Sequence, residues 1–391
     1  MRYVKILLLS LILSFYFGLE IDYAQNADIP RIDASQLTGT TVTSYMQDDI
    51  VPGKNLIYCS TFQLAWNQLV DDIIKAPIQL SDDPLIARML NQRLTGKQDL
   101  SEDCYIAMAG LKKDGIEERI NQALKVKFKT TPGIDISLQH PDDILAYAFL
   151  LKDLKFEKEF QNIKRGIMFN GDTYVEAFGI EDFSHIALNP DSLTQPEIID
   201  YKDQVAIMDY KNDNDFVIIL KNKSPDDELI LAKISPGKTL IDTINLVINR
   251  ITPSAYSKLR DGEKLAIPRF DLNILREYQE LVNKDLLNKG FDGYFISKAI
   301  QSIRFKLNEK GAYLKSEAAI ASANEDIRLR AFILNKPFLI LLKQKGAKYP
   351  YFTIWVENAE LLIKKGNDSV SLDDKIKSVL LSMPEKKGEV H

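Results

Sequence analysis

The feature that most constrains the fold of this chain is a change in its apolar pattern near residue 144. Before that point, apolar residues recur at helical spacing within residues 61–74, 84–94 and 115–126. After it come short runs rich in β-branched and aromatic residues and bounded by turn residues, which predict strands at 144–151, 204–209, 216–220, 265–270, 303–307, 338–342 and 351–356. Segments 239–251 and 275–287 return to helical spacing. A helical first third followed by many strands predicts an α+β fold rather than a doubly wound α/β fold.

The chain divides into three segments by composition. Arg2 and Lys5 precede an apolar run at 6–17, which is shorter than the ~20 residues that span a bilayer as a helix and is typical of a signal peptide. We expect residues 1–27 to be that peptide, and the protein to be secreted or periplasmic. An uncleaved anchor is the alternative, because neither Ala24 nor Ala27 completes the small-x-small pattern of a cleavage site. Residues 28–363 lack any linker-like tract and predict one domain, and residues 364–391 form a polar tail.

The sequence carries no recognisable catalytic or metal-binding motif. The three histidines have no metal-ligand spacing, and the sequence has no CxxC, no GxGxxG, no phosphate loop and no G-x-S-x-G. We therefore expect neither an enzyme nor a metal or cofactor. The formal net charge of -5 gives no basic footprint for nucleic acid. Cys59 and Cys104 leave two alternatives open, a disulfide in an oxidising compartment or two buried thiols.

One C-terminal segment has an ordered set of distinctive residues. Residues 335–359 read NKPFLILLKQKGAKYPYFTIWVENA. The positions that matter are Asn335, Pro337, Phe338, Pro350, Phe352, Val356 and Asn358. This set resembles the C-terminal signature of the serpin superfamily, in which Asn-x-Pro-Phe opens a strand and a second strand ends near Val-x-Asn-Pro. Ala359 stands where that family usually has proline.

Five further segments are similar to serpin segments and follow in the same order. They are NLIYCS at 55–60, KFEKEF at 155–160, QVAIMDYKNDNDFVIIL at 204–220, AIPRF at 266–270 and NEKG at 308–311. The resemblance covers roughly residues 50–360. It implies a large mixed sheet, an exposed reactive-centre loop that acts as bait for a protease, and insertion of that loop into the sheet after cleavage.

The resemblance places the hinge of the loop at Glu309, Gly311 and Ala312 and the loop itself at 311–334. At a period of two residues, one face of the loop is uncharged and the other face carries the charges. The uncharged face has Ala312, Leu314, Ser316, Ala318, Ile320 and Ser322, and the charged face has Tyr313, Lys315, Glu317, Ala319 and Ala321. This alternation permits insertion, because an unpaired buried charge costs several kcal/mol.

Other features of the loop are unfavourable for fast insertion. Tyr313 and Leu314 are bulky where the family has small residues, Cys59-Ser60 stands for Ser-Pro, and Gln301 stands for histidine. Residues 316–332 also have the composition of a short exposed helix, which non-inhibitory members can carry.

Two alternatives follow for the function and several for the cleavage point. The first is a suicide-substrate inhibitor, expected to be a monomer, whose partner is a serine or cysteine protease. The second is a non-inhibitory protein with the same fold that binds a ligand or another protein. The family's spacing places the scissile bond near Glu325-Asp326, whereas a trypsin-like protease would favour Arg328 or Arg330.

Overall fold

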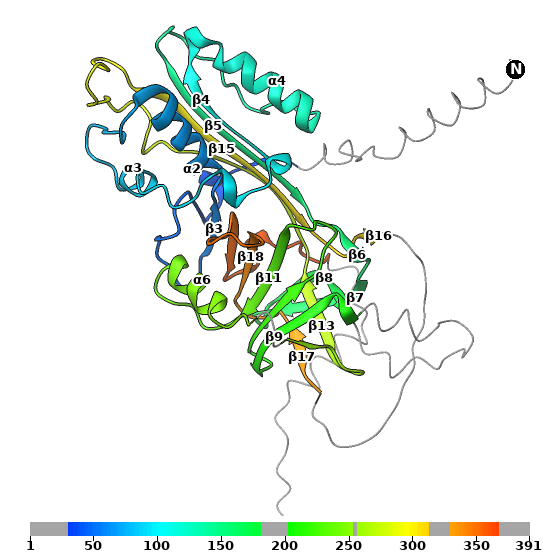
Figure 1. The fold of residues 1–391 in the computed structure, drawn as a ribbon. Helices are drawn as coiled ribbons and strands as arrows, with labels where there is room; N and C mark the ends of the chain where they lie inside the picture. The colour runs from blue at the N-terminus through cyan, green and yellow to red at the C-terminus, as the bar shows by residue number, and fades with distance from the viewer. Residues whose placement is uncertain (1–29, 181–201, 253–255, 313–328, 367–391) are drawn as a thin grey trace, which may run out of the picture.

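In the computed structural model, residues 30–180, 202–252, 256–312 and 329–366 are described. A five-stranded sheet runs along one side of the molecule (Figure 1). Its strands in spatial order are β1 (Ile32–Asp33), β14 (Phe270–Glu277), β15 (Ile296–Leu307), β5 (Ile144–Asp153) and β4 (Tyr105–Leu111). The two long central strands, β15 and β5, are parallel, and each is antiparallel to its other long neighbour, β14 or β4.

The eight-stranded sheet contains most of the strands predicted from the second half of the sequence. Its strands in spatial order are β12 (Ser257–Lys258), β9 (Val205–Asn212), β10 (Asp215–Leu220), β11 (Asp227–Lys233), β18 (Phe338–Gln344), β19 (Phe352–Val356), β3 (Asn55–Cys59) and β2 (Thr40–Thr43). Every pair from β12 to β3 is antiparallel, and only the edge pair of β2 and β3 is parallel.

Two smaller sheets lie at one end of the five-stranded sheet (Figure 1). One has the order β17 (Ala331–Ile333), β13 (Lys264–Pro268), β8 (Thr173–Ile180) and β7 (Gln161–Phe169), and the other pairs β16 (Gly311–Ala312) with β6 (Phe156–Lys158). Gly179 in β8 adopts φ 153°, and a Cβ there would lie 1.9 Å from the carbonyl oxygen of Leu265 in β13. Only glycine therefore fits at this position, where β8 pairs with β13.

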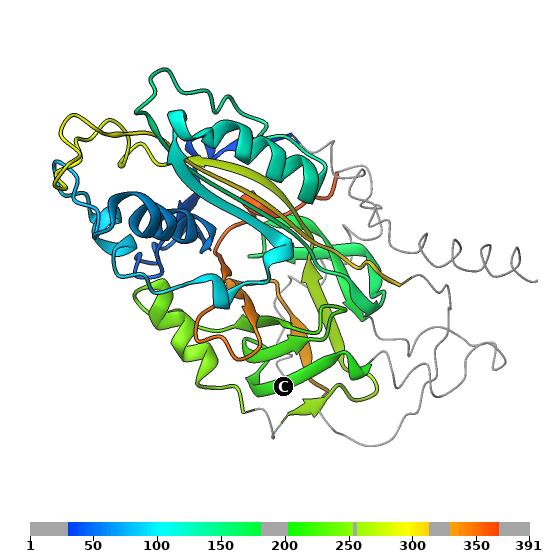
Figure 2. The ribbon, with the colours of Figure 1, turned by 45° about the horizontal axis from the view of Figure 1, so that its top comes forward.

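The α-helices are α2 (Thr61–Gln68), α3 (Leu85–Leu90), α4 (Ile116–Phe128) and α6 (Leu240–Ile248), and α2 continues as a π-helix at Leu69–Ile74. Helices α2 and α4 cover opposite faces of the five-stranded sheet (Figure 2), whereas α6 packs on the eight-stranded sheet. Short 3-10 turns lie at Ala34–Gln36, Lys97–Asp99, Glu102–Cys104, Lys112–Asp114 and Ala359–Leu361.

Strand β5 is buried on both sides because helices pack on each face. Its residues Ala146 and Ala148 join the core around α2, whereas Leu145, Tyr147 and Phe149 join the core around α4. A strand covered on both faces is a continuous apolar run, which is the pattern that predicts β5 from the sequence.

The signature segment forms the β18–β19 hairpin, and Asn358, just after the hairpin, takes part in a hydrogen-bond network. The Asn358 side chain donates to the carbonyl oxygens of Gly39 (2.8 Å) and Gly53 (2.9 Å). The amide of Asn55 donates to the Asn358 side chain at 2.9 Å. Asn358 is also the N-cap of the 3-10 turn at Ala359–Leu361, so Ala359 occupies the first helical position, where proline is also favourable.

One predicted helix is wrong. Residues 275–287 begin as the end of β14 and continue as turns, although Tyr278, Leu281 and Leu286 are buried as a helical pattern requires. Pairing of β14 with β15 extends to Glu277, and Asn283 then adopts φ 56°, which a continuing helix cannot accommodate. Strands β3, β4, β7, β8 and β11 were not predicted as strands; β4, with the sequence YIAMAGL, has only one β-branched residue.

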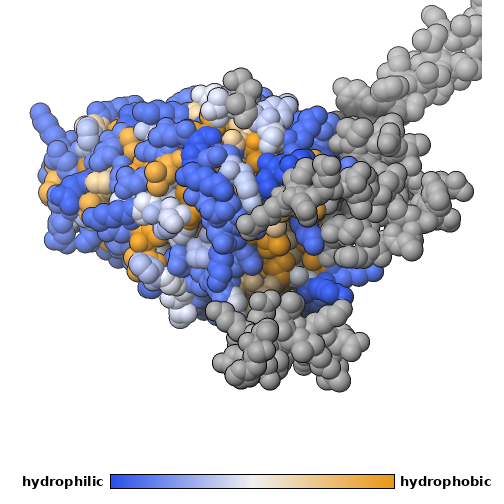
Figure 3. All heavy atoms as spheres, turned by 90° about the horizontal axis from the view of Figure 1, so that it is seen from below, coloured by the Kyte–Doolittle hydropathy of each residue, from blue (hydrophilic) through white to orange (hydrophobic). Residues whose placement is uncertain are grey.

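Both cysteines are free thiols buried in the core, which selects the second alternative for them. Burial raises the pKa of the Cys59 thiol to about 11 and that of Cys104 to about 12. The N-terminal 29 residues and the tail from 367 lie outside the described residues. Within the described part of the chain, no helix has the length and apolarity needed to cross a membrane. On the face seen in Figure 3, apolar residues form separate patches between hydrophilic ones.

Candidate loop-insertion site

The central pair of the five-stranded sheet, which we call the seam, is the boundary between β5 and β15. Their register runs from Ile296 opposite Ile144 to Lys306 opposite Asp153. The strands flanking the seam are antiparallel to it on both sides. A strand entering here in the opposite direction would be antiparallel to both neighbours at once. The seam can therefore accept one strand without forming any parallel ladder.

The predicted hinge continues β15 directly beyond the end of the sheet. The carbonyl oxygen of Glu309 accepts a hydrogen bond from the Phe160 N–H at 2.9 Å, and that of Lys310 accepts one from the Phe156 N–H at 3.3 Å. Gly311 and Ala312 then form β16, which runs parallel to β6. The hinge therefore lies beside β6 and does not turn back into the seam.

One ion pair holds the hinge. Oε2 of Glu309 lies 2.5 Å from Nη2 of Arg269, and the other arm of Arg269 donates to Glu176 at 3.0 Å. Arg269 lies between β13 and β14, so the start of the loop is tied to the corner where two sheets meet.

Gln301 lies on the inner face of the seam and is fully buried. Its amide donates to the carbonyl oxygen of Cys59 at 3.1 Å and to the Thr61 hydroxyl at 2.9 Å, at the start of α2. The hydroxyl of Tyr278 donates to the Gln301 carbonyl at 2.6 Å. Glutamine thus makes three hydrogen bonds here, in the position that the resemblance assigns to histidine.

A buried ion pair connects the seam to the eight-stranded sheet. Lys152 of β5 points inward and pairs with Asp227 of β11, whose side chain is 1% exposed. Asp227 also accepts hydrogen bonds from Ser224 (2.6 Å) and Tyr351 (2.9 Å). Burial opposes the charge on Asp227, but Lys152 and these hydroxyls outweigh it and lower the pKa of Asp227 below its usual value.

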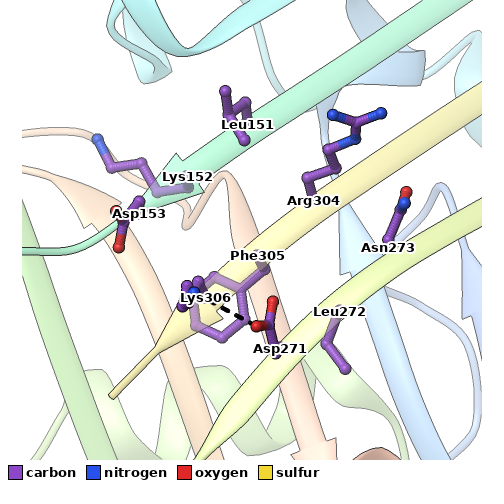
Figure 4. Close-up of a pocket in the computed structure, with 9 residues that line it drawn as sticks. All are labelled: Leu151, Lys152, Asp153, Asp271, Leu272, Asn273, Arg304, Phe305 and Lys306. Atoms are coloured by element: carbon purple, nitrogen blue, oxygen red, sulfur yellow. Dashed lines mark ion pairs between the residues drawn. The ribbon is translucent and has the colours of Figure 1, made fainter. Parts of the chain in front are cut away.

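The outer face of the seam differs between its two halves. Helix α4 covers the half at 145–149, where Leu145, Tyr147 and Phe149 pack against it. The half at 151–153 and 304–306 holds only a shallow pocket of about 10 Å³, which Figure 4 shows with Arg304, Lys306 and Asp271 around it. Lys306 pairs with Asp271 at 3.4 Å, whereas Nε of Arg304 has no partner among the described residues.

The far end of the loop is anchored at Arg330. Its guanidinium donates to Glu263 at 2.6 and 2.8 Å and lies over the rings of Tyr210 and Phe332. The Glu263 side chain has no exposed surface, yet hydrogen bonds from Arg330 and Arg260 hold its pKa at about 2 despite burial. Arg330 is therefore a structural cation in this conformation.

Two residues beyond Arg330, Ile333 and the signature residue Asn335, are hydrogen-bonded to the eight-stranded sheet. Lys233 of β11 donates to the carbonyl oxygen of Ile333 and to the Asn335 side chain, each at 2.9 Å. Burial lowers the pKa of Lys233 to about 8. The side-chain acceptor at position 335 is thus used to satisfy a buried lysine.

The structure places only part of the predicted site. Glu309 lies at the hinge, the backbones of Gly311 and Ala312 form β16, and Arg330 lies at the far end. Ser316, Ala318, Ala319, Glu325, Asp326 and Arg328 lie outside the described residues. Of the segment 316–332 with helical composition, the described residues 329–332 are extended and enter β17. Sequence reasoning did not find Lys152, Asp227 or Glu263, because their partners lie 75 and 67 positions away.

The comparison with solved structures found chains to which this one is similar. This chain is similar to Serpin48 of the insect Tenebrio molitor, with 16% identity over 77% of this chain and 74% of that one and a TM-score of 0.38. It is similar to mouse protein-Z dependent protease inhibitor, with 14% identity over 63% of each chain and a TM-score of 0.41. It is also similar to thyroxine-binding globulin in complex with thyroxine, with 13% identity over 63% of this chain and 65% of that one and a TM-score of 0.37.

The other two comparisons found nothing. No family model and no curated protein matches the chain. The chain spans less than two thirds of the second and third structures named above, and at these scores the likenesses carry no argument about activity. The fold is α+β, which is the class predicted from the sequence. The features that matter for function are the chain's own: the parallel seam, the hinge that continues β15, and the β18–β19 hairpin.

Proposed function

We propose that this protein is a suicide-substrate inhibitor of a serine or cysteine protease. The observation that carries the proposal is the parallel seam of β5 and β15, from which the predicted hinge leads directly. A protease nucleophile attacks the scissile carbonyl of the loop, and the amine half leaves. The loop then retains the protease as an ester or thioester at its new carboxyl end while it inserts into the seam.

Insertion exchanges one parallel ladder for two antiparallel ladders. Antiparallel pairing is slightly more stable per residue, and the inserted strand adds backbone hydrogen bonds on both of its sides. The exchange therefore favours the inserted form once cleavage frees the loop from its anchor at Arg330. The energy difference between the two forms would drive the trapping step.

The two halves of the seam suggest the order of insertion. The half at 151–153 and 304–306 lies nearest the hinge and is not covered by α4. The strand can enter there first. Beyond Phe149 it must displace α4 from the sheet, and the contacts of α4 with Leu145, Tyr147 and Phe149 oppose this step. We expect slower trapping than a small-residue hinge would allow, because Tyr313 and Leu314 lead the strand.

We propose that cleavage occurs upstream of Arg330. Its ion pair with the buried Glu263 would have to break before the side chain could enter a protease pocket. This ion pair does not involve Glu325, Asp326 or Arg328, which remain the candidate positions for the scissile bond. Cleavage at Glu325-Asp326 would require a protease that accepts glutamate at the cleavage point, and cleavage at Arg328 would require a trypsin-like protease.

The proposal also includes where the protein works. The segment at 1–27 would export the chain, and residues 28–363 would act as one monomeric domain outside the cytoplasm. A non-inhibitory binding protein is the second candidate, favoured by the bulky Tyr313 and Leu314.

The test is incubation of the mature protein with serine and cysteine proteases that cleave after acidic or basic residues. An inhibitor gives an SDS-stable complex and, after loop cleavage, a higher melting temperature. Mass spectrometry of the released peptide locates the scissile bond. Cleavage within 313–329 with neither a complex nor a higher melting temperature would leave the binding protein as the function.

A further inference from the structure

A second cavity lies away from the seam, between β2, the segment 45–48, the start of α3 and the end of β14. Its volume is about 240 Å³. For comparison, an engineered apolar cavity of about 150 Å³ accommodates benzene. The side chains around it are Thr41, Val42, Thr43, Tyr45, Asp48, Pro84, Leu85, Ile86, Arg276, Tyr278 and Glu280. The cavity can therefore hold a small organic molecule.

The lining of the cavity has two carboxylates, Asp48 and Glu280, and one cation, Arg276. Arg276 pairs with Glu280, and its guanidinium lies 5.2 Å from the ring centre of Tyr278. This pair neutralises one cation and one anion. Asp48 makes no ion pair with any residue in the described parts of the chain; its carboxylate accepts the neighbouring Asp49 N–H at 3.0 Å and interacts with the Thr43 side chain. One carboxylate of the lining is left without a cation.

Burial of the Asp48 carboxyl has a cost that a cation would offset. Burial raises the pKa of Asp48 above its usual value, against smaller opposing effects of Thr43 and the Asp49 backbone. The pKa of the neighbouring Tyr45 is raised as well, first by burial and then by the negative charges of Asp48, Glu280 and Asp49. With Asp48 and Glu280 against Arg276, the lining carries one more carboxylate than cation.

The rest of the lining is suited to an apolar body. Pro84, Leu85 and Ile86 form one side, at the start of α3, and Leu85 is 50% exposed. Tyr45 and Tyr278 supply aromatic rings; Arg276 already lies over the ring of Tyr278, so the ring of Tyr45 is the one whose face can attract a further cation. A carboxylate, two tyrosines and an aliphatic wall together favour one class of ligand.

We propose that this cavity binds a small organic amine. Its ammonium group pairs with Asp48, and its apolar or aromatic body packs between Tyr45, Tyr278 and the first turn of α3. Apart from Tyr278, which also donates to Gln301, the cavity is lined by residues outside the loop-insertion site, so the proposal stands whether or not the loop inserts.

Occupation of the cavity reaches the seam through one side chain. Tyr278 lines the cavity, and its hydroxyl donates to Gln301 of β15 at 2.6 Å. A body packed on Tyr278 therefore contacts the residue that orients Gln301. Amine binding would rigidify this contact and raise the melting temperature of the intact protein.

The experiment uses phenethylamine as the probe and isothermal titration calorimetry as the measurement. Phenethyl alcohol and 3-phenylpropionate have the same ring with a neutral and an anionic end. We expect the amine to bind, the alcohol to bind more weakly by about tenfold, and the anion not to bind. Equal binding of amine and alcohol, or no binding of the amine at millimolar concentration, would overturn the proposal.

Two pairs of variants locate the site. Asp48→Asn keeps the acceptor for the Asp49 N–H but removes the charge, and we expect about a tenfold loss of amine affinity. Asp49→Asn removes a neighbouring exposed charge outside the lining and should change affinity by less than about threefold. Equal losses in the two variants would show that the amine is attracted by the surface alone.

Leu85 tests the site without touching Asp48. Leu85→Lys places an ammonium beside the cavity, at an exposed position where the fold tolerates it, and should abolish amine binding. Leu85→Glu changes the same position with the opposite charge and should retain or increase affinity. Melting curves of all four variants without ligand separate loss of the site from loss of the fold. Amine binding that survives Leu85→Lys in a folded protein would contradict the proposal.

Discussion

The five-stranded and eight-stranded sheets each have a parallel pair at one edge, but only the five-stranded sheet also has a parallel pair in its middle. In the eight-stranded sheet the parallel pair of β2 and β3 is at the edge, and every interior ladder is antiparallel. In the five-stranded sheet a parallel pair lies in the middle. A new strand placed between two antiparallel neighbours must be parallel to one of them, whereas at the seam it is antiparallel to both. Strand direction alone therefore makes one sheet closed and the other open to insertion.

The buried polar groups of the seam are bonded to neighbouring elements and not across the seam. The inner face of the seam carries Gln301 and Lys152, both satisfied by partners on other elements. Its hydrogen bonds and ion pair connect the seam to α2 and β11 rather than across the seam itself. The strands can therefore separate while each remains attached to the element beneath it.

The largest expected effect tests whether the seam accepts a strand. Ala318→Arg puts a charge on the uncharged face of the loop, so that insertion would bury it without a partner. We expect the SDS-stable complex to disappear and the protein to be cleaved as a substrate. Ala319→Arg, one position on, points the same charge to the solvent face and should retain the complex. A complex that survives Ala318→Arg would remove the distinction between the two sheets.

How far the sequence determined these two sheets depends on the range of the contacts. The apolar runs at 144–151, 216–220 and 338–342 became β5, β10 and β18, because a strand buried on both faces requires a continuous apolar run. The turns after Glu277 were predicted as a helix, because burial of Tyr278, Leu281 and Leu286 imitates helical spacing. The spacing of apolar residues along the chain indicates which side chains are buried, but it does not indicate which neighbouring element buries them.

The candidate site was predictable at its hinge and not in its supports. Glu309 and Gly311 follow from a short motif, and the unusual Gln301 was visible as a departure from the family pattern. The Lys152–Asp227 and Arg330–Glu263 pairs join residues 75 and 67 positions apart. Nothing local marks Lys152 as buried within an otherwise apolar strand. Its role depends on the packing of one sheet on the other.

The next effect sharpens the connection between the sheets. Lys152→Met leaves Asp227 buried without its cation, and breaking such a pair costs about 3–5 kcal/mol of the free energy of unfolding. Urea unfolding at neutral pH measures this loss. The double variant Lys152→Met with Asp227→Leu removes both charges and should recover most of it. Lys155→Met, at an exposed position just beyond β5, is the matched control and should change stability by less than about 0.5 kcal/mol.

The smallest effect concerns the third sheet, which anchors the end of the loop that does not move. The pKa of Glu263 is about 2 in the folded protein, below its ordinary value of 4.5. A carboxyl with a lowered folded pKa stabilises the protein above its unfolded pKa, and this contribution is lost as the pH falls from 4.5 to about 2. We expect Glu263→Gln to lose about 2 kcal/mol at pH 7 and the difference from the wild type to shrink below pH 4.5. Urea unfolding at pH 7, 4.5 and 3 measures that difference, and Glu157→Gln, exposed in β6, is the control. A difference that stays constant over this range would mean that Arg330 is held by packing on Tyr210 and Phe332 and not by charge.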